Sequence, residues 1–288
     1  MKIESFQFGR WALEWLAGDG ARLGSLRFDG ADLLTVRPVS FKPPRADYGY
    51  YETRPVYGYD DCFPTVDACR FPGDLQFDVD DHGEICWLPW KVHREVDNCV
   101  VCTVSSGQLP VRFTRAMIFG ETSLQWKFEV VNEADWTVPF LHVMHGLMPL
   151  DQVCDLSLPP YGNLFDEIAG RQLPAADPAD LCDRLLGSPA GSARMFLLRD
   201  LEASALHIGW RSGLSLQVEF PIELFPTLGI WWNHGGYPDE AGCRRVECAF
   251  EPIPARSSSL ARSYEQGTYL SVGPNDRLEW SVLWKINT

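Results

Sequence analysis

The chain has 288 residues, of which 45% are hydrophobic and 22% charged, a composition typical of globular proteins. Its 39 acidic and 25 basic residues give a formal net charge of −14, and because such a surface repels phosphate groups we expect no nucleic-acid partner. No apolar run reaches the roughly 20 residues of a membrane-spanning helix, and the first residues lack the charged-then-apolar order of a signal peptide. The nine cysteines, an odd number scattered along the chain, suit reduced thiols. These features predict a cytoplasmic protein with no membrane partner.

The first element with a clear signal is a hairpin. In RFDGADLL (27–34), the dipeptide Asp29-Gly30 is of the kind favoured in two-residue turns between antiparallel strands. Further along, SLQWKFEV (123–130) alternates strictly between apolar and polar residues. The apolar face carries Leu124, Trp126, Phe128 and Val130. A period of two with large apolar side chains predicts a half-buried antiparallel strand.

One segment has the signals of a short peripheral helix. In DPADLCDRLLG (177–187), Asp177 can cap the helix, Pro178 occupies its first position and Gly187 ends it. We therefore expect this helix to be an exception in a chain that is otherwise built from strands.

Two later segments, LSLQVEF (214–220) and LEWSVLWKI (278–286), repeat the alternation of the earlier strand. Prolines and glycines fall mostly between the strands, where turns need them. No linker, internal repeat or low-complexity tract divides the chain. We predict a single all-β domain over residues 1–288, folded as a large antiparallel β-sandwich with few short helices.

Three segments carry residues suited to chemistry. DVDDHGEICWLPW (78–90) joins acids and His82 to an apolar run with two tryptophans. VPFLHVMHGLMPLD (138–151) places two histidines in an apolar run, and RRVECAFEPIPA (244–255) places two glutamates in a segment that otherwise resembles a strand. An acid in such a strand is costly to bury unless it is paired or used. The structural alternatives stay open, because a histidine in an apolar strand often only hydrogen-bonds and a glutamate before proline is often exposed.

Metal binding is a further possibility that the spacing disfavours. His142 and His145 are three residues apart, as are Cys99 and Cys102. In an extended backbone, residues three apart point to opposite faces, and no second cysteine pair follows at zinc-finger spacing. Phosphate-binding loops and Gly-x-Ser-x-Gly elbows are absent from the sequence. We therefore expect no metal and no cofactor.

Taken together, five motifs resemble those of the galactose mutarotase-like family, the aldose 1-epimerases and their relatives. In order, they are YDDCFPTVD (59–67), DHGEICWLPW (81–90), LHVMHGLMPLD (141–151), GIWWNHGGYP (229–238) and ECAFEPIPA (247–255). The resemblance extends from about residue 55 to the end of the chain. It implies the fold of that family, a large antiparallel β-supersandwich, which agrees with the predicted strands.

The resemblance also implies an activity and the residues that carry it. Aldose 1-epimerases, or mutarotases, are isomerases that interconvert the α and β anomers of a free sugar by opening and closing its ring. Glu251 matches the carboxylate base that takes the proton of the C1 hydroxyl. His145 matches the acid that protonates the ring oxygen, and His82 matches a second histidine that holds the ring oxygen or a neighbouring hydroxyl. General acid–base pairs of this kind operate near neutral pH.

Further residues are expected to bind the sugar. Asp61 is a candidate acceptor for a hydroxyl. Trp87 or Trp90, of which we assign Trp87, is expected to form an apolar wall of the pocket, because aromatic rings stack on the C–H faces of sugars. Trp231 and Trp232 point opposite ways in a strand, so only one can face the pocket, and we assign Trp232. A separate expectation is that Asn233 and His234 contact hydroxyls.

The resemblance has departures that bear on the substrate. In the hexose-6-phosphate branch of the family an arginine follows the His-Gly motif, whereas here EICWLPW follows it. A neutral sugar or a sugar acid is therefore favoured over a phosphorylated one.

Two other functional classes share this kind of fold. The alternative function is a non-catalytic carbohydrate-binding protein of the same fold. A polysaccharide lyase or hydrolase is disfavoured, because such enzymes usually need a further, often helical, domain. The expected partner is a small-molecule carbohydrate, and the protein is expected to be a monomer or a homodimer.

Overall fold

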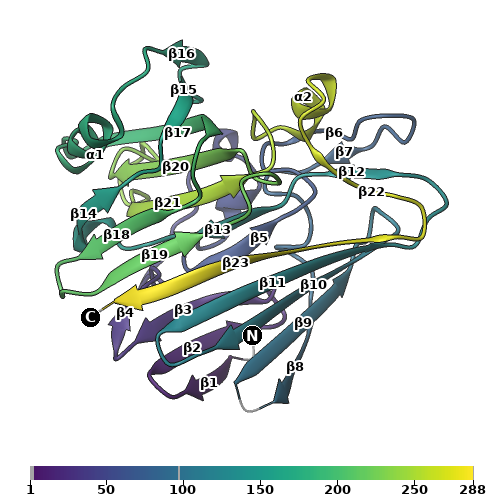
Figure 1. Cartoon of the computed structure of the whole chain (residues 1–288), viewed down its shortest axis with the longest axis horizontal. Coiled ribbons are helices and arrows are strands. Elements are labelled where there is room, and N and C mark those ends of the chain that lie inside the picture. Colours follow the sequence, from purple (N-terminus) through teal and green to yellow (C-terminus); the bar gives the residue numbers. More distant parts are fainter. Residues whose placement is uncertain (1–2, 97, 288) are drawn as a thin grey trace.

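The computed structural model describes residues 3–96 and 98–287, which form an antiparallel β-structure with two short α-helices (Figure 1). Every strand pairing within this part of the chain is antiparallel. Among the described residues, no helix combines the length and the apolar character needed to cross a membrane.

Three large sheets make up most of the molecule. The six-stranded sheet contains β1 (Glu4–Phe8), β2 (Trp11–Leu16), β3 (Arg22–Phe28), β5 (Tyr59–Cys62) and β13 (Val143–Gly146) in this order, with β4 (Ala31–Asp32) paired to β3. The five-stranded sheet has the order β16 (Arg171–Leu173), β15 (Tyr161–Asp166), β17 (Ser192–Leu201), β20 (Thr227–His234) and β21 (Val246–Ile253). The eight-stranded sheet has the order β14 (Val153–Ser157), β18 (Leu206–Trp210), β19 (Ser215–Glu219), β23 (Arg277–Asn287), β11 (Ser123–Asn132), β10 (Val111–Phe119), β9 (Cys99–Ser105) and β8 (Lys91–Val96).

Smaller elements complete the fold. Two short ladders pair β12 (Val138–Phe140) with β22 (Leu270–Val272), and β6 (Cys69–Arg70) with β7 (Asp78–Val79). The helices are α1 (Pro178–Leu186) and α2 (Leu260–Glu265), with single 3₁₀ turns η1 (Ala46–Tyr48), η2 (Tyr51–Thr53) and η3 (Leu150–Gln152). In Figure 1, α1 lies at the periphery beside β14, and α2 lies near the β6–β7 ladder.

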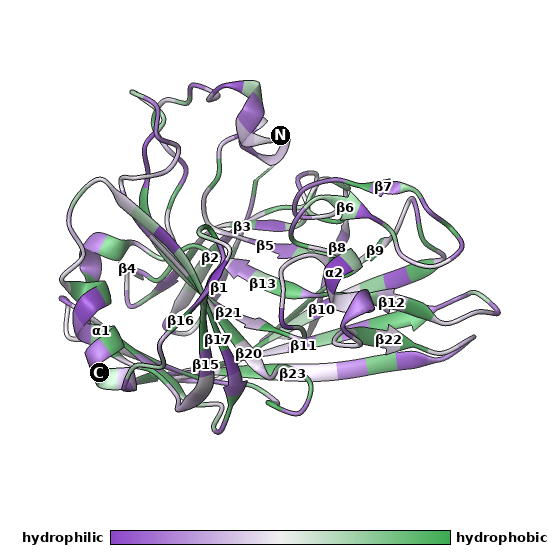
Figure 2. Cartoon of the chain, turned by 90° about the horizontal axis from the view of Figure 1, so that it is seen from above, coloured by the Kyte–Doolittle hydropathy of each residue, from purple (hydrophilic) through white to green (hydrophobic). Residues whose placement is uncertain are grey.

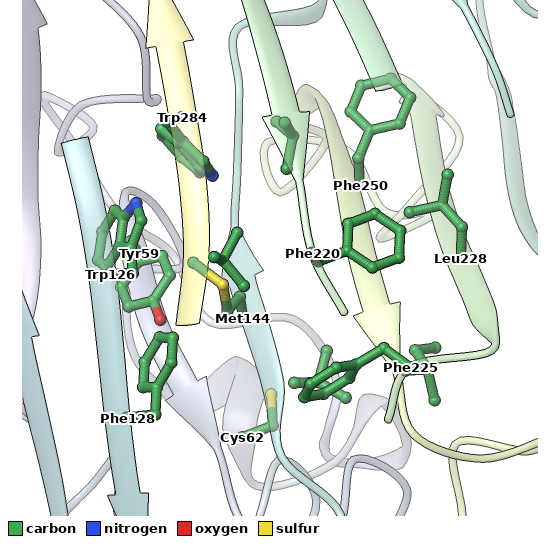
Figure 3. Packing of buried hydrophobic residues seen from close by; sticks show 14 of the residues in the cluster. Tyr59, Cys62, Trp126, Phe128, Met144, Phe220, Phe225, Leu228, Phe250 and Trp284 are labelled. Carbon is green, nitrogen blue, oxygen red and sulfur yellow. The ribbon is translucent and has the colours of Figure 1, made fainter. Parts of the chain in front are cut away.

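The six-stranded and five-stranded sheets lie side by side. Strand β21 runs next to β13, and backbone hydrogen bonds in both directions join Met148 to Cys248. Aromatic side chains on one face of this combined layer pack against the eight-stranded sheet. The ring centroids of Tyr59 and Trp126 are 4.7 Å apart, and those of Trp126 and Trp284 are 5.2 Å apart. Figure 3 shows these rings grouped in the core, where each buried aromatic side chain contributes about 2–3 kcal/mol.

The sequence-based expectations for the fold class, the alternating strands, the hairpin and the first helix are confirmed. The three alternating segments are β11, β19 and β23, and in β11 the even-numbered apolar side chains are buried. Figure 2 shows hydrophilic and hydrophobic bands along β23. Asp29 and Gly30 both have positive φ, 49° and 81°, in the turn between β3 and β4, as a two-residue hairpin of this type requires. Helix α1 begins after Asp177, whose side chain accepts a hydrogen bond from the Ala179 amide, and it ends at Gly187. The fold is the expected all-β supersandwich.

Candidate active site

The site lies on the face of β5, β13, β20 and β21 that points away from the sandwich core. In the pairing of β5 with β13, Asp60 stands opposite His145 and Asp61 opposite Met144. Because neighbouring residues of a strand project to opposite faces, the two aspartates are separated by the sheet itself. Asp60 and His145 take the outer face, whereas Asp61 and Met144 take the core face.

His145 is held by an ionised carboxylate. Its Nδ1 atom lies 3.0 Å from Oδ1 of Asp60 and 3.1 Å from the hydroxyl of Tyr51, which itself donates to Asp60 at 2.9 Å. Burial alone would raise the pKa of Asp60, but Arg22, His145 and Arg54 outweigh it and hold that pKa well below its ordinary value. Since an ionised carboxylate only accepts hydrogen bonds, Nδ1 of His145 carries the proton. This arrangement leaves Nε2 as the nitrogen available for chemistry.

Asp60 is in turn fixed by two arginines. Arg22, with a fully buried side chain, places Nη2 3.1 Å from Oδ2 of Asp60, and Nη2 of Arg54 lies 3.0 Å from the same oxygen. The Arg54 guanidinium also lies 3.9 Å above the ring of Trp87. These contacts compensate the charge of a carboxylate that is only 1% exposed.

His82 occupies a strained turn that aims it at His145. Its φ of 63° belongs to the left-handed region, and Gly83 follows with a φ of 69°. A side chain at Gly83 would collide with the carbonyl oxygen of Phe63, 2.0 Å from the position of a Cβ, so only glycine fits there. The His82 ring stacks on Tyr51 with centroids 3.7 Å apart, and its centroid is 4.8 Å from that of His145. Gly83 therefore allows a turn that delivers the imidazole of His82 to the cavity.

Glu251 enters the same cavity from β21. Its side chain is 4% exposed, and burial raises its pKa to about 7, with further increases from Glu167 and Asp60 and an opposing effect of His145. A carboxyl group with such a pKa exchanges protons near neutral pH, as a general base must. Glu251 and His145 thus bring two proton-transfer groups to one cavity.

The cavity has a volume of about 390 Å³, within the range of small-molecule sites. Its carboxylates outnumber its cations. The acidic lining residues are Glu52, Asp67, Asp81, Glu167, Glu247 and Glu251, against the single guanidinium of Arg245. The remaining walls come from Tyr51, Val56, Val66, His82, His145, Ile168, Met195, Trp231, Tyr237 and Ser258.

The positive charge of Arg245 is already used within the protein. Its Nη1 and Nη2 atoms contact the two carboxylate oxygens of Glu52 at 2.6 and 2.9 Å, and its Nε lies 2.8 Å from Glu247. Elsewhere in the cavity, burial and the neighbouring carboxylates of Glu167 and Asp81 raise the pKa of Asp67 to about 6. Within the part of the chain that the structure describes, the lining is therefore predominantly acidic and offers no unpaired guanidinium to an anionic ligand.

Asp61 does not reach the cavity. It is fully buried in the core, where it accepts hydrogen bonds from Tyr59 at 2.6 Å and from Arg115, and its Oδ1 lies 3.0 Å from Nε2 of His142. The carboxylate on the cavity side belongs to its neighbour Asp60. The expectation of a hydroxyl acceptor at Asp61 is corrected for this reason.

The two neighbouring tryptophans of β20 point to opposite faces of the sheet, as Asp60 and Asp61 do. Trp232 is 2% exposed and packs on Phe250 in the core, so our assignment of Trp232 to the pocket is corrected to Trp231, which lines the cavity. The indole N–H of Trp231 donates to Glu247 at 3.2 Å. Trp87 lies outside the lining, where it supports Arg54.

Asn233 and His234 stabilise turns of the backbone and do not line the cavity. Fully buried Asn233 accepts hydrogen bonds from the amides of Gly236 and Tyr237 and donates to the carbonyl of Tyr237. The Nδ1 atom of His234 lies 3.0 Å from the carbonyl oxygen of Ser188. Both side chains are engaged by backbone groups of nearby turns, which leaves the expected contacts with hydroxyls without geometric support.

The structure brings together His82, His145 and Glu251, and it adds residues that sequence reasoning missed. Asp60 and Trp231 each adjoin a residue that was proposed, and strand alternation was the signal that could have raised both. Tyr51 and Arg245 had no comparable signal. Tyr51 contacts Asp60 from an irregular region of the chain. Arg245 contacts Glu52, which lies far away in the sequence.

Solved structures with similar folds span the full length of the chain. The Slr1438 protein from Synechocystis sp. PCC 6803 matches with a TM-score of 0.76 at 17% identity, over 100% of this chain and 96% of its own. A galactose mutarotase-like protein from Clostridium acetobutylicum matches with a TM-score of 0.72 at 16% identity, over 100% and 98%. An aldose epimerase homologue from C. elegans matches with a TM-score of 0.67 at 14% identity, over 99% and 98%.

The chain therefore has the galactose mutarotase-like fold, as the sequence motifs implied. No protein-family model and no curated protein matches the chain. At such low identities the likeness establishes the fold alone, and the function has to be argued from the site.

Proposed function

We propose that this protein is an aldose 1-epimerase that interconverts the α and β anomers of a free sugar. The observation that carries the proposal is the convergence of Glu251 and His145 on one cavity, with His145 oriented by the ionised carboxylate of Asp60. A site that only binds a sugar has no need of a buried carboxyl group whose pKa is raised to about 7.

The chemistry follows from these positions. Glu251 accepts the proton of the C1 hydroxyl while the Nε2–H of protonated His145 protonates the ring oxygen, so the C1–O5 bond breaks and an open-chain aldehyde forms. Rotation about C1–C2 presents the other face of the carbonyl. Ring closure then returns the proton from Glu251 to the carbonyl oxygen and the proton of the C5 hydroxyl to His145. Every proton that leaves one group is recovered, and no cofactor is consumed.

The charge of the cavity favours a neutral sugar. Six acidic side chains line it, and the guanidinium of Arg245 is bound to Glu52 and Glu247. Hydroxyl groups donate well to carboxylates, whereas a phosphate or a uronate would meet like charge in a partly desolvated space. A neutral aldose therefore fits the lining better than a sugar phosphate or a sugar acid.

The proposal is tested by following freshly dissolved α-anomers to equilibrium by polarimetry or NMR. The panel contains glucose, galactose, rhamnose, glucuronic acid and glucose 6-phosphate. We expect the protein to accelerate the equilibration of at least one neutral sugar and to have no effect on the two anionic ones. Measurable binding without acceleration of any sugar would instead favour the non-catalytic carbohydrate-binding protein.

Trp231 is expected to contribute affinity through stacking. Trp231→Ala should raise KM roughly three- to tenfold, with a smaller change in kcat, because an aromatic contact with a C–H face contributes about 0.5–1.5 kcal/mol. The matched control is Trp136→Ala, since Trp136 is partly exposed and lies outside the cavity lining. Equal KM values for the two variants would remove Trp231 from the sugar site.

A further inference from the structure

Three potential metal ligands cluster beside the cavity, where His82 and His145 belong to the lining and Cys62 is buried behind it. One ligand atom each from Cys62, His82 and His145 lies within 4.8 Å of the other two. The three residues come from β5, from the turn after β7 and from β13, so the sheet pairing and the strained turn together create the cluster. Cys62 follows Asp60 by two residues in β5 and therefore shares its face.

Each histidine has a carboxylate near its Nδ1 atom, and for His145 this is the hydrogen-bonded second contact that metal-binding histidines usually show. Nδ1 of His145 lies 3.0 Å from Asp60, and Nδ1 of His82 lies 3.1 Å from Asp81. A carboxylate at one ring nitrogen fixes the orientation of the ring and leaves the other nitrogen to ligate. In this arrangement Nε2 is the ligand atom of His145.

We propose that Cys62, His82 and His145 form a binding site for a divalent cation that prefers thiolate and imidazole ligands, foremost Zn²⁺. Bond lengths of about 2.3 Å to sulfur and 2.0–2.1 Å to nitrogen place tetrahedral ligand atoms roughly 3.5 Å apart. The three ligand atoms lie within 4.8 Å of one another, so side-chain movements of about 1 Å bring them to this spacing. The fourth position faces the cavity and takes a water molecule. On binding, the Cys62 thiol releases its proton to solvent.

Neither pair of residues spaced three apart, His142 with His145 or Cys99 with Cys102, forms this site as a pair. His142 lies on the other side of the sheet, with Nε2 3.0 Å from Asp61, and Cys102 is buried in β9 of the eight-stranded sheet. One histidine of the first pair, His145, joins two residues that no spacing rule connects to it.

Cation binding has a consequence that rests on the proposed function. A Zn²⁺ ion on Nε2 of His145 occupies the atom that would protonate the sugar ring oxygen. The cation should therefore inhibit anomer interconversion, and inhibition should compete with the sugar because two of its ligands, His82 and His145, line the cavity.

Binding itself is tested without any activity measurement, by titrating the chelator-treated full-length protein with Co²⁺. We expect one equivalent to produce a thiolate-to-cobalt charge-transfer band and visible bands of tetrahedral intensity, both of which Zn²⁺ displaces. Cys62→Ser should abolish the charge-transfer band and weaken Zn²⁺ binding at least tenfold. The matched control is Cys154→Ser, which changes an exposed cysteine and should leave the spectrum intact.

A second variant keeps the test decisive if Cys62→Ser does not fold. His82→Asn preserves the backbone, because asparagine readily adopts the positive φ of 63° at this position, and it should also weaken Zn²⁺ binding at least tenfold. A charge-transfer band that is absent from the wild type, or that survives both substitutions, would overturn the site.

The inhibition is measured as a ratio to each variant's own metal-free rate of anomer equilibration. We expect Zn²⁺ to inhibit the wild type, EDTA to reverse the effect, and Cys62→Ser to reduce the inhibition at least tenfold. Inhibition without the cobalt charge-transfer band would overturn the proposed ligands. A protein that binds Co²⁺ as described but accelerates no sugar would retain the metal site and lose the epimerase function, so the two failures are distinguishable.

Discussion

Glu251→Gln is expected to lower kcat for anomer interconversion by about 10²–10⁴-fold, the usual contribution of a general base. Glutamine has nearly the shape of glutamate but cannot accept the proton of the C1 hydroxyl. The variant should still bind the sugar, because the rest of the cavity lining is unchanged. The measurement is anomer equilibration by NMR at saturating sugar, with near-ultraviolet circular dichroism to verify the fold. A kcat within threefold of the wild type would exclude Glu251 as the base.

The pH dependence gives an independent check on the same residue. Burial raises the pKa of Glu251 to about 7, so the ionised base of the free enzyme accumulates only as pH rises through that value. We expect kcat/KM to rise tenfold per unit below pH 7 and to lose this dependence in Glu251→Gln. An acidic limb near the ordinary carboxyl pKa of 4.5 would contradict a buried base.

The raised pKa of Glu251 also means that this residue lowers the free energy of unfolding at neutral pH. The folded state holds a proton on Glu251 up to about pH 7, whereas the unfolded chain releases it near 4.5, so stability falls as pH rises between these values. Glu251→Gln removes this loss and should raise the free energy of unfolding above pH 7 by up to about 3 kcal/mol. Urea denaturation at pH 5 and pH 8 measures it, and the gain should be several times larger at pH 8 than at pH 5.

Asp61→Asn is expected to lower the free energy of unfolding by about 3–5 kcal/mol, the range for breaking a buried ion pair. Asp61 and Arg115 are both fully buried, and the carboxylate also contacts Tyr59 and His142. Burial would raise the pKa of Asp61, but Arg115 and the hydrogen bonds outweigh it and lower that pKa, so the group is ionised at neutral pH. Asparagine leaves the Arg115 charge uncompensated in the core.

The measurement is urea unfolding at pH 7, with Asp29→Asn as the matched control. Asp29 pairs with Arg10 at an exposed hairpin turn, where an ion pair contributes about 0–1 kcal/mol and asparagine tolerates the positive φ of 49°. Folded Asp61→Asn should retain the wild-type kcat, because its side chain lies on the core face. Equal losses of unfolding free energy in Asp61→Asn and Asp29→Asn would mean that the buried contacts of Asp61 stabilise the protein no more than an exposed ion pair does.

Local sequence was sufficient for the elements of the fold. The hairpin at Asp29-Gly30 depends on the φ angles of two adjacent residues, and helix α1 depends on a cap, a proline and a glycine within eleven positions. The strands β11 and β23 depend on alternation alone. Signals of this kind depend on a few neighbouring residues, so the elements can be recognised without knowledge of the rest of the chain. The motifs around His82, His145 and Glu251 likewise stood in the sequence in readable form.

What local sequence determined about the site was that Asp60 and Asp61 face opposite ways, as do Trp231 and Trp232. It could not determine which member faces the cavity, because these strands have an apolar core on one face and a covered site on the other, so both neighbours are buried or nearly so. That choice depends on the side of the sheet that meets the eight-stranded layer. The meeting of Cys62 with two histidines depends on it as well. Only the packing of the sheets, a sum of contacts between distant segments, decided which residues share the cavity.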